Sequence, residues 1–276
     1  MGIFKFRKHS LDLGLRTYVM GILNITPDSF SDGGRYFDAD RALERALEIE
    51  ALGADLIDIG AQSTAPSSSP LDTGEELARL STSLKAISKQ LKIPISVDTY
   101  HPQVARFALE NGAHIINDIS ASVSPEMAEI VAHYGAGWVI MHNRGGADAI
   151  GNVYEGGVIN HVRSFFEESM QKALAYGLSP EQLCFDPGIG FGKSMADNLS
   201  LIKHMADIKL PTCALLTGLS RKRVLGSVTG ESVPKKRDAA GLAAHTVAIA
   251  QGTDIIRAHN VADAIQGARM ADALCR

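Results

Sequence analysis

A single (β/α)8 barrel of the TIM type, in the α/β class, is the fold that the sequence predicts. Eight short apolar runs divide the chain: Tyr18–Leu23, Leu56–Ile59, Ile95–Val97, Ile115–Ile116, Trp138–Met141, Leu183–Phe185, Ala214–Leu216 and Ile255–Ile256. Short apolar strands that alternate with helices indicate parallel βαβ units. A chain of 276 residues has the length of one closed barrel. We therefore expect one domain over residues 1–276, with residues 1–17 as a lead-in segment.

Helical spacing of apolar residues fills the intervals between these runs. The predicted helices cover Ala39–Leu52, Glu75–Gln90, Pro102–Asn111, Pro125–Tyr134, Val158–Tyr176, Asn198–His204 and Asp238–Gln251. Several of them end in a glycine turn that leads to the next strand, as at Gly53 and Gly112. The loops after the first two strands run to Gly34 and Ser69, beyond the usual length of about 2–6 residues. We expect these two extended βα loops at the C-terminal face of the barrel, as candidate lids.

The charge and cysteine content exclude several classes of protein. Lys and Arg number 27 against 31 Asp and Glu, which argues against a nucleic-acid binder. The three cysteines, Cys184, Cys213 and Cys275, form no CxxC pair and are expected to be free thiols. The sequence has no signal peptide and no apolar stretch of about 18 residues, so a cytoplasmic protein without a membrane span is predicted.

Every predicted strand ends in a polar side chain. In chain order these are Asn24, Asp58, Asp98, Asn117 with Asp118, His142 with Asn143, Asp186, Thr217 with Ser220–Lys222, and Arg257 with His259. Active sites of such barrels lie at the carboxyl ends of the strands. The sequence therefore predicts a ring of functional side chains at this end.

The ring divides into two chemical halves. Asp98, Asn117 and Asp186 offer acceptors that suit a flat heterocycle rich in N–H groups. Lys222, Arg257 and His259 suit a phosphate or a carboxylate. For Asp98 and Asp118 a helix-capping role is the alternative, and Asp58, inside its strand, is expected to support the site without touching a ligand.

Two other kinds of site, a nucleotide-binding loop and a zinc site, receive little support from the sequence. Gly188–Ser194 ends in Gly-Lys-Ser, but its first glycine is too close to them for a nucleotide-binding loop. We interpret it as a glycine-rich turn with a packing Phe191. The nine histidines show no HExxH motif and no close pair, so a structural zinc site is not expected.

Four segments carry a family resemblance: Met20–Gly34, Asp186–Lys193, Gly218–Lys222 and Arg257–Val261. They resemble the signatures of dihydropteroate synthases, and the resemblance extends from about Tyr18 to the C-terminus. It implies that the amine of 4-aminobenzoate (p-aminobenzoate) attacks the methylene of 6-hydroxymethyl-7,8-dihydropterin diphosphate. The products would be 7,8-dihydropteroate and diphosphate, in folate biosynthesis.

The resemblance also implies site residues at matching positions. For the pterin they are Asp98, Asn117, Met141, Asp186, Phe191 and Lys222, of which Asp98, Asp186 and Lys222 would be catalytic. For the diphosphate they are Asn24, Arg257 and His259, with Asn24 also a ligand of Mg²⁺. For the aminobenzoate they are Phe30, Thr64, Pro66 and Ser220. A homodimer and inhibition by sulfonamides are implied as well.

The chain departs from the family pattern at three places. Ala65 stands where the family has a loop arginine, which removes one charge-assisted contact of about 1.5–3 kcal/mol. Arg144 follows the fifth strand, where it either supplies the missing charge or is a solvated loop residue. Asn260 replaces the more usual aspartate. Altered sulfonamide sensitivity and reduced activity are both open consequences.

Two alternative functions remain at this point. A methyltetrahydrofolate–corrinoid methyltransferase would share Asp98, Asn117 and the Asp186 loop, but it needs no cation cluster. A non-catalytic pterin-binding paralogue is supported by Ala65 alone. Pterin binding without turnover would identify the paralogue.

Overall fold

Eight parallel strands close into a barrel in the computed structural model, which describes residues 2–25, 35–62, 71–145 and 152–276. Around the barrel the strands are β3 (Tyr18–Asn24), β4 (Leu56–Gly60), β5 (Ile95–Asp98), β6 (Ile115–Asp118), β7 (Gly137–Met141), β8 (Leu183–Asp186), β9 (Ala214–Gly218) and β10 (Ile255–Ala258), which pairs with β3. The predicted (β/α)8 barrel is confirmed. Almost every residue of these strands is buried, which is why they read as continuous apolar runs.

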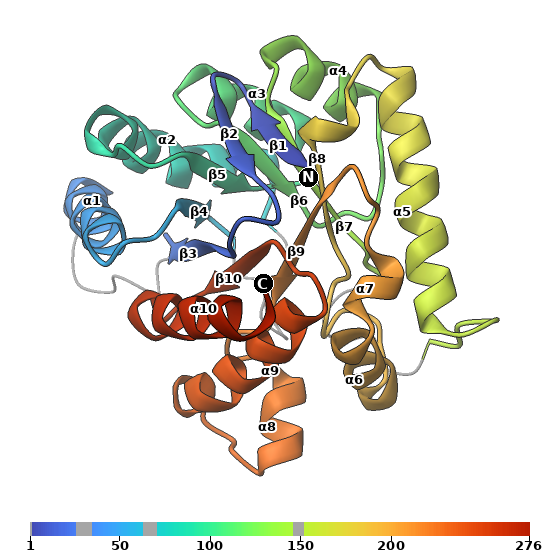
Figure 1. Ribbon diagram of the computed structural model, residues 1–276. Coiled ribbons are helices and arrows are strands. Elements are labelled where there is room, and N and C mark those ends of the chain that lie inside the picture. Colours follow the sequence, from blue (N-terminus) through green and yellow to red (C-terminus); the bar gives the residue numbers. More distant parts are fainter. Residues whose placement is uncertain (1, 26–34, 63–70, 146–151) are drawn as a thin grey trace.

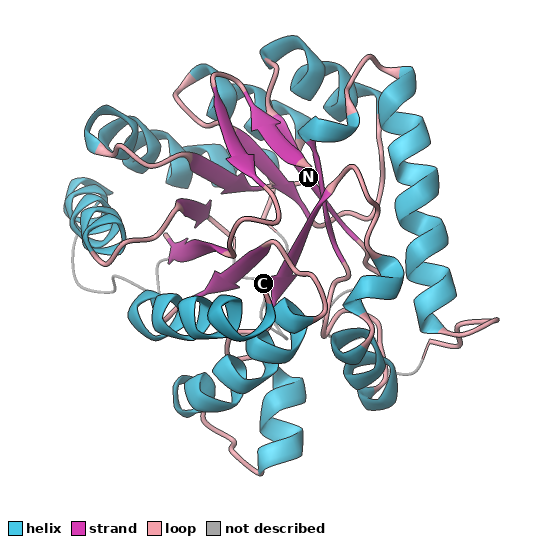
Figure 2. Ribbon diagram, viewed as in Figure 1, coloured by secondary structure: helices cyan, strands magenta, loops and turns pink. Residues whose placement is uncertain are grey.

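Helices surround the barrel on its outside (Figure 1; Figure 2). They are α1 (Arg35–Ala51), α2 (Thr73–Gln90), α3 (Pro102–Glu110), α4 (Pro125–Tyr134), α5 (Val158–Ala175), α6 (Met195–Lys203), α7 (Met205–Ile208), α8 (Arg223–Thr229), α9 (Asp238–Ala250) and α10 (Val261–Cys275), with 3-10 turns η2 (Pro180–Gln182) and η3 (Pro234–Arg237). Three of them, α7, α8 and α10, were not predicted. No helix in the described ranges has both the length and the apolar character needed to cross a membrane.

Helix α10 gives a weak sequence signal because its buried face consists mostly of alanine. Its buried residues are Val261, Ala264, Ala268 and Ala271. Small side chains contrast little with the polar face, so the helical period is hard to see. Asn260 accepts a hydrogen bond from the backbone N–H of Asp263 at 3.3 Å and caps the helix. This residue therefore has a structural role that asparagine fills as well as aspartate.

The first residues of the chain close the bottom of the barrel. Strands β1 (Ile3–Phe6) and β2 (His9–Asp12) form an antiparallel hairpin within residues 1–17, for which the sequence predicts only a lead-in segment. Phe4 and Phe6 are fully buried. A Cβ atom on Gly137 would lie 2.9 Å from the Phe4 ring and 3.0 Å from the Phe6 Cβ, so only glycine lets the hairpin dock on β7.

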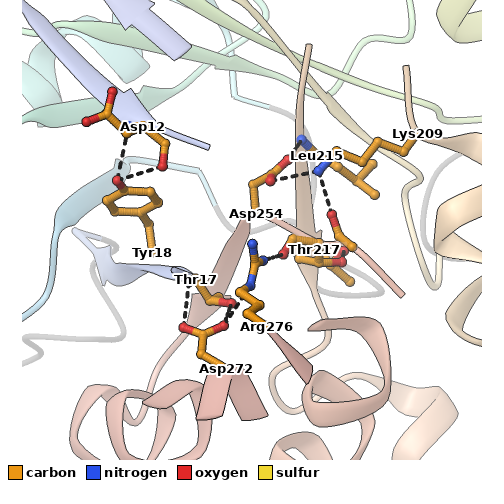
Figure 3. A network of polar contacts seen from close by, with 11 residues as sticks. Asp12, Thr17, Tyr18, Lys209, Leu215, Thr217, Asp254, Asp272 and Arg276 are labelled. Carbon is orange, nitrogen blue, oxygen red and sulfur yellow. Dashed lines mark hydrogen bonds and ion pairs between the residues drawn. The ribbon is translucent and has the colours of Figure 1, made fainter. Parts of the chain in front are cut away.

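Polar groups at this lower end pair with one another (Figure 3). Asp254 is fully buried and accepts hydrogen bonds from the Lys209 ammonium at 2.7 Å and the Leu215 backbone N–H at 2.9 Å. Asp272, on α10, accepts from the backbone and hydroxyl of Thr17, both at 2.7 Å. The Asp272 contacts tie the last helix to the residue before the first barrel strand, and the Asp254 contacts tie the start of β10 to β9.

Candidate active site

A cavity lies at the carboxyl ends of the barrel strands. Its lining comes from seven of the eight barrel strands or the turns after them: Ile22, Asp98, Asn117, Ile119, Met141, Asp186, Phe191, Gly218, Ser220, Lys222, Arg257 and His259. Parallel pairing places Asp98 beside Asn117, Met141 beside Asp186 and Gly218 beside Arg257. The barrel thus brings together nine of the predicted site residues, which are far apart in the sequence.

Four predicted residues do not line this cavity. Asn24 ends β3 with an exposed side chain and lies beside Gly60, whose Cβ, if present, would be 3.5 Å from the Asn24 Oδ1. Phe30, Thr64 and Pro66 lie outside the described residues, as does Ala65. Conversely, Ile22, Ile119 and Gly218 line the cavity and were not among the predicted site residues. The inward alternation of β3, two residues before Asn24, could have indicated Ile22.

Asp58 lies beneath the cavity and is fully buried. Its carboxylate accepts hydrogen bonds from the hydroxyl of Ser96 at 2.6 Å, the amide of Asn117 at 3.0 Å and Nε of Arg257 at 2.6 Å. The expected supporting role of Asp58 agrees with this position, since the residue is absent from the cavity lining.

Asp98 faces the cavity with an unusual proton affinity. Burial, reinforced by the charge of Asp58, raises the pKa of Asp98 to about 7, although Arg257 opposes the shift. The Arg257 Nη2 is 3.3 Å from Asp98 Oδ2. Helix α3 is preceded by His101 at its N-cap, so Asp98 does not cap that helix. A carboxyl group poised near neutral pH in a cavity is typical of a ligand-binding or catalytic group.

Asp186 and Lys222 face each other across the end of β8. Burial raises the pKa of Asp186, and Lys222 partly offsets this. Burial lowers the pKa of Lys222 to about 8, while Asp186 opposes that shift. Lys222 donates to the backbone carbonyl of Ile189 and lies 4.9 Å from the centre of the Phe191 ring. The pair presents an acceptor and a donor side by side at the floor of the cavity.

The glycine-rich segment after β8 is a turn whose backbone carbonyls are held by the side chain of Lys193. The Lys193 ammonium donates to the carbonyls of Gly188, Phe191 and His142 at 2.9, 3.0 and 3.2 Å. Gly188 has a φ of +63°, and a Cβ there would lie 1.9 Å from the His142 carbonyl oxygen. Glycine is therefore required at this close approach. Lys193 holds the turn, which places Phe191 in the cavity lining.

His259 lies at the outer part of the site together with Ser220. The Ser220 hydroxyl is 2.9 Å from the His259 Nδ1 and accepts from the His259 backbone N–H at 3.2 Å. Burial, with the charges of Arg221 and Arg257, lowers the pKa of His259 to about 4. At neutral pH this imidazole is neutral, so it would act as a hydrogen-bonding group while Arg257 and Lys222 supply the positive charge.

Asp118 and Arg144, each of which had two possible roles from the sequence, make local contacts in the structure. Asp118 accepts a hydrogen bond from the Ser120 backbone N–H at 2.8 Å and closes a turn. Arg144 donates to the Val153 carbonyl at 3.1 Å, with its guanidinium 5.5 Å from the centre of the Tyr154 ring. Neither residue lines the cavity.

A Mg²⁺ ion fits the residues present only as a partner of a bound phosphate. Among the described residues no group of three or more His, Cys, Asp or Glu side chains could hold a metal. Mg²⁺ commonly keeps several waters and takes one or two protein ligands plus phosphate oxygens. The carboxamide oxygen of Asn24, at the rim, is suited to that kind of site.

Comparison with known proteins agrees with the geometry. Residues 20–259 match the model of the family described as "Pterin binding enzyme". A dihydropteroate synthase of Synechocystis is 42% identical over 96% of this chain and 92% of its own length. The dihydropteroate synthase structure of Xanthomonas albilineans with 4-aminobenzoic acid has a TM-score of 0.91 and 38% identity, covering 99% of this chain and 97% of that one.

A second solved structure, that of the Clostridium difficile enzyme in the presence of pteroic acid, has a TM-score of 0.90 and 39% identity over 96% of this chain and 99% of that one. The family match covers residues 20–259, which include nearly the whole barrel and three of the four signature segments in full. The chain therefore belongs to the dihydropteroate synthase family of pterin-binding enzymes.

Proposed function

We propose that the protein is a transferase that condenses 6-hydroxymethyl-7,8-dihydropterin diphosphate with 4-aminobenzoate, giving 7,8-dihydropteroate and diphosphate. The observation that carries this proposal is the cavity itself. Acceptors from Asp98, Asn117 and Asp186 share it with the cations Lys222 and Arg257. One ligand with an N–H-rich ring and an anionic tail matches both halves.

The pterin half of the reaction depends on the buried carboxylates. A dihydropterin can stabilise positive charge at its exocyclic methylene, so the C–O bond to diphosphate can break ahead of attack by the amine. Asp98 and Asp186 would accept hydrogen bonds from ring N–H groups and stabilise the pterin more strongly as that charge develops. No protein nucleophile is required by this scheme.

The leaving group depends on Arg257 and His259 at the outer part of the site. Arg257 is held by Asp58 and Asp98, and His259 is neutral, so the guanidinium would bind the diphosphate through its charge and the imidazole through a hydrogen bond. Asn24 would contribute a ligand to Mg²⁺, which when bound neutralises charge on the diphosphate. The amine of the aminobenzoate then forms the new C–N bond and loses a proton.

The aminobenzoate would bind at the rim, near Ser220 and the two predicted βα loops. Phe30, Thr64 and Pro66 are proposed for this role on the family resemblance alone. Sulfonamides, whose arylamine resembles that of the aminobenzoate, are proposed inhibitors. Ala65 removes a cation from this region, so we expect weaker binding of the aminobenzoate carboxylate and an altered response to sulfonamides.

The decisive experiment incubates the purified protein with the pterin diphosphate, 4-aminobenzoate and Mg²⁺ and follows both products. Equal amounts of diphosphate and dihydropteroate support the proposal. Diphosphate without dihydropteroate would show that the pterin half works and the rim does not. Pterin binding without either product would favour the non-catalytic paralogue, which Ala65 alone supports. The relatives are dihydropteroate synthases, so the corrinoid methyltransferase is set aside.

We also propose a cytoplasmic homodimer. The adjacent helices α9 and α10 expose apolar side chains, with Val247 44%, Met270 60% and Leu274 68% exposed. Exposed apolar groups of this kind favour association with another surface. Light scattering coupled to size-exclusion chromatography measures the mass directly, and a monomer at micromolar concentration would contradict the dimer.

A further inference from the structure

The buried carboxylate of Asp58 makes contacts that determine which atoms the cavity presents. It bonds to three side chains on three different strands, Ser96 on β5, Asn117 on β6 and Arg257 on β10. Two of these three partners line the cavity, whereas Asp58 does not. A residue in this place acts on a ligand only through its neighbours.

The contact with Asn117 fixes the direction of an amide. A carboxylate has no donor, so the atom of Asn117 that lies 3.0 Å from Asp58 Oδ2 must be the NH₂ group. The amide oxygen is thereby directed away from Asp58. With the amide reversed, two acceptors would face each other in a buried place, which costs on the order of 1–3 kcal/mol.

The contact with Arg257 fixes the direction of a charge. Asp58 Oδ2 receives Nε at 2.6 Å, which leaves the outer nitrogens of the guanidinium for other partners. One of them, Nη2, reaches Asp98 Oδ2 at 3.3 Å. The guanidinium is therefore held by two carboxylates, one beneath the cavity and one within it.

We propose that Asp58 is a positioning residue that sets the ring specificity of the site, by turning the Asn117 oxygen and the outer face of Arg257 toward the ligand. The cavity edge formed by Asp98, Asn117 and Asp186 then presents the amide oxygen of Asn117 between two carboxyl groups. Such an edge selects a heterocycle that presents several N–H donors together. The inference rests on the proposed function because it deepens the pterin specificity of the same cavity.

Asp58→Asn is the principal test, with Asp254→Asn as the matched control. Both residues are fully buried carboxylates of the barrel, but Asp254 belongs to the lower end. Calorimetric titration with 6-hydroxymethylpterin should show a loss of affinity of about 10- to 100-fold for Asp58→Asn. Asp254→Asn should bind the pterin within about twofold of the wild type, provided that both variants are folded at the assay temperature.

A double-mutant cycle separates positioning from a general loss of packing. If Asp58 acts through Asn117, Asp58→Asn in an Asn117→Ala background loses at least about threefold less affinity than in the wild type. If the two substitutions instead reduce pterin affinity by factors that simply multiply, Asp58 does not act through Asn117, and the role assigned to Asn117 is overturned.

The ligand-free protein provides a second readout that needs no folded variant of Asp58. In a nitrogen-15 spectrum the Asn117 side-chain NH₂, assigned by its disappearance in Asn117→Ala, should exchange slowly with solvent because it bonds to a buried carboxylate. Exchange at the rate of an exposed amide would overturn the inference. A wild-type protein with a protected Asn117 amide but no pterin affinity would contradict the proposed function instead.

Discussion

The charged groups at the two ends of the barrel differ in their hydrogen-bond partners and in their pKa values. At the lower end the buried Asp254 accepts from a lysine and a backbone amide, and the half-buried Asp272 accepts from the backbone N–H and the hydroxyl of Thr17 (Figure 3). At the upper end burial moves the pKa of Asp98 up to about 7 and the pKa of Lys222 down to about 8. At the lower end both oxygens of each carboxylate have a donor within the protein, whereas Asp98 and Lys222 keep hydrogen-bonding capacity for a ligand.

This difference indicates that the charged groups of the lower end stabilise the fold and that those of the upper end can bind a ligand. A buried charge that has all its partners holds elements together. A buried charge with too few partners is unfavourable until a ligand supplies the rest, which is why perturbed groups cluster in functional sites. Substitutions at the two ends should therefore affect stability and activity separately.

The largest effect is expected at the lower end, from Phe6→Ala. The ring of Phe6 is fully buried beneath the barrel, so its removal leaves a cavity. We expect a loss of about 3–5 kcal/mol in the free energy of unfolding, measured by urea denaturation. Pterin affinity of the folded variant should stay within about twofold. A selective loss of pterin affinity would show that the hairpin communicates with the site.

Asp186→Asn should produce the opposite result. The carboxylate that faces Lys222 would become a neutral amide, and we expect kcat to fall about 10²- to 10³-fold, or about 2.7–4 kcal/mol. Thermal unfolding should show a folded protein of similar stability, since the charge is disfavoured by burial. Turnover near the wild-type rate would remove Asp186 from the catalytic machinery.

Asp254→Asn makes the same carboxylate-to-amide substitution at the lower end of the barrel. Lys209 would lose its partner, and the Leu215 amide would keep an acceptor only if the new side chain turned its oxygen inward. We expect a loss of about 2–3 kcal/mol in stability from equilibrium unfolding. The ratio kcat/KM at a temperature well below the transition should be unchanged.

The smallest effect concerns the pH dependence of stability at Asp98. Its pKa in the folded protein is about 7, above the ordinary value of 3.8, so between these values the folded state binds more protons than the unfolded state. Stability from this group is therefore lost as pH rises through that window. Asp98→Asn cannot titrate, and its stability relative to the wild type should rise by at least about 1 kcal/mol between pH 4.5 and pH 8.

Unfolding curves at both pH values test this, with Asp254→Asn as the control at the other end. A relative stability that does not change with pH would mean that Asp98 is ionised at little cost in the fold. Pterin affinity of Asp98→Asn should be low at both pH values if the carboxylate binds the ring.

The amino-acid sequence by itself determined the barrel and the chemical character of its upper end. Eight apolar runs and the polar residue after each predict the strands and the ring, because parallel strands buried on both faces allow few other patterns. The signature segments determined the family. Helix α10 was not predicted because its buried alanines differ little in hydropathy from its polar face. The hairpin was not predicted because the alternation of Phe4 and Phe6 extends over only a few residues.

Only the tertiary structure decided how the site residues affect one another. Asp58 and Arg257 are 199 positions apart, yet a hydrogen bond of 2.6 Å joins them. No local pattern encodes that contact, because it depends on the closure of β10 against β3. The same closure buries His259 beside two arginines and makes it neutral, whereas the sequence suggested a cation. Residue types are local properties, but proton affinity and the direction of an amide depend on neighbours that only the folded chain brings together.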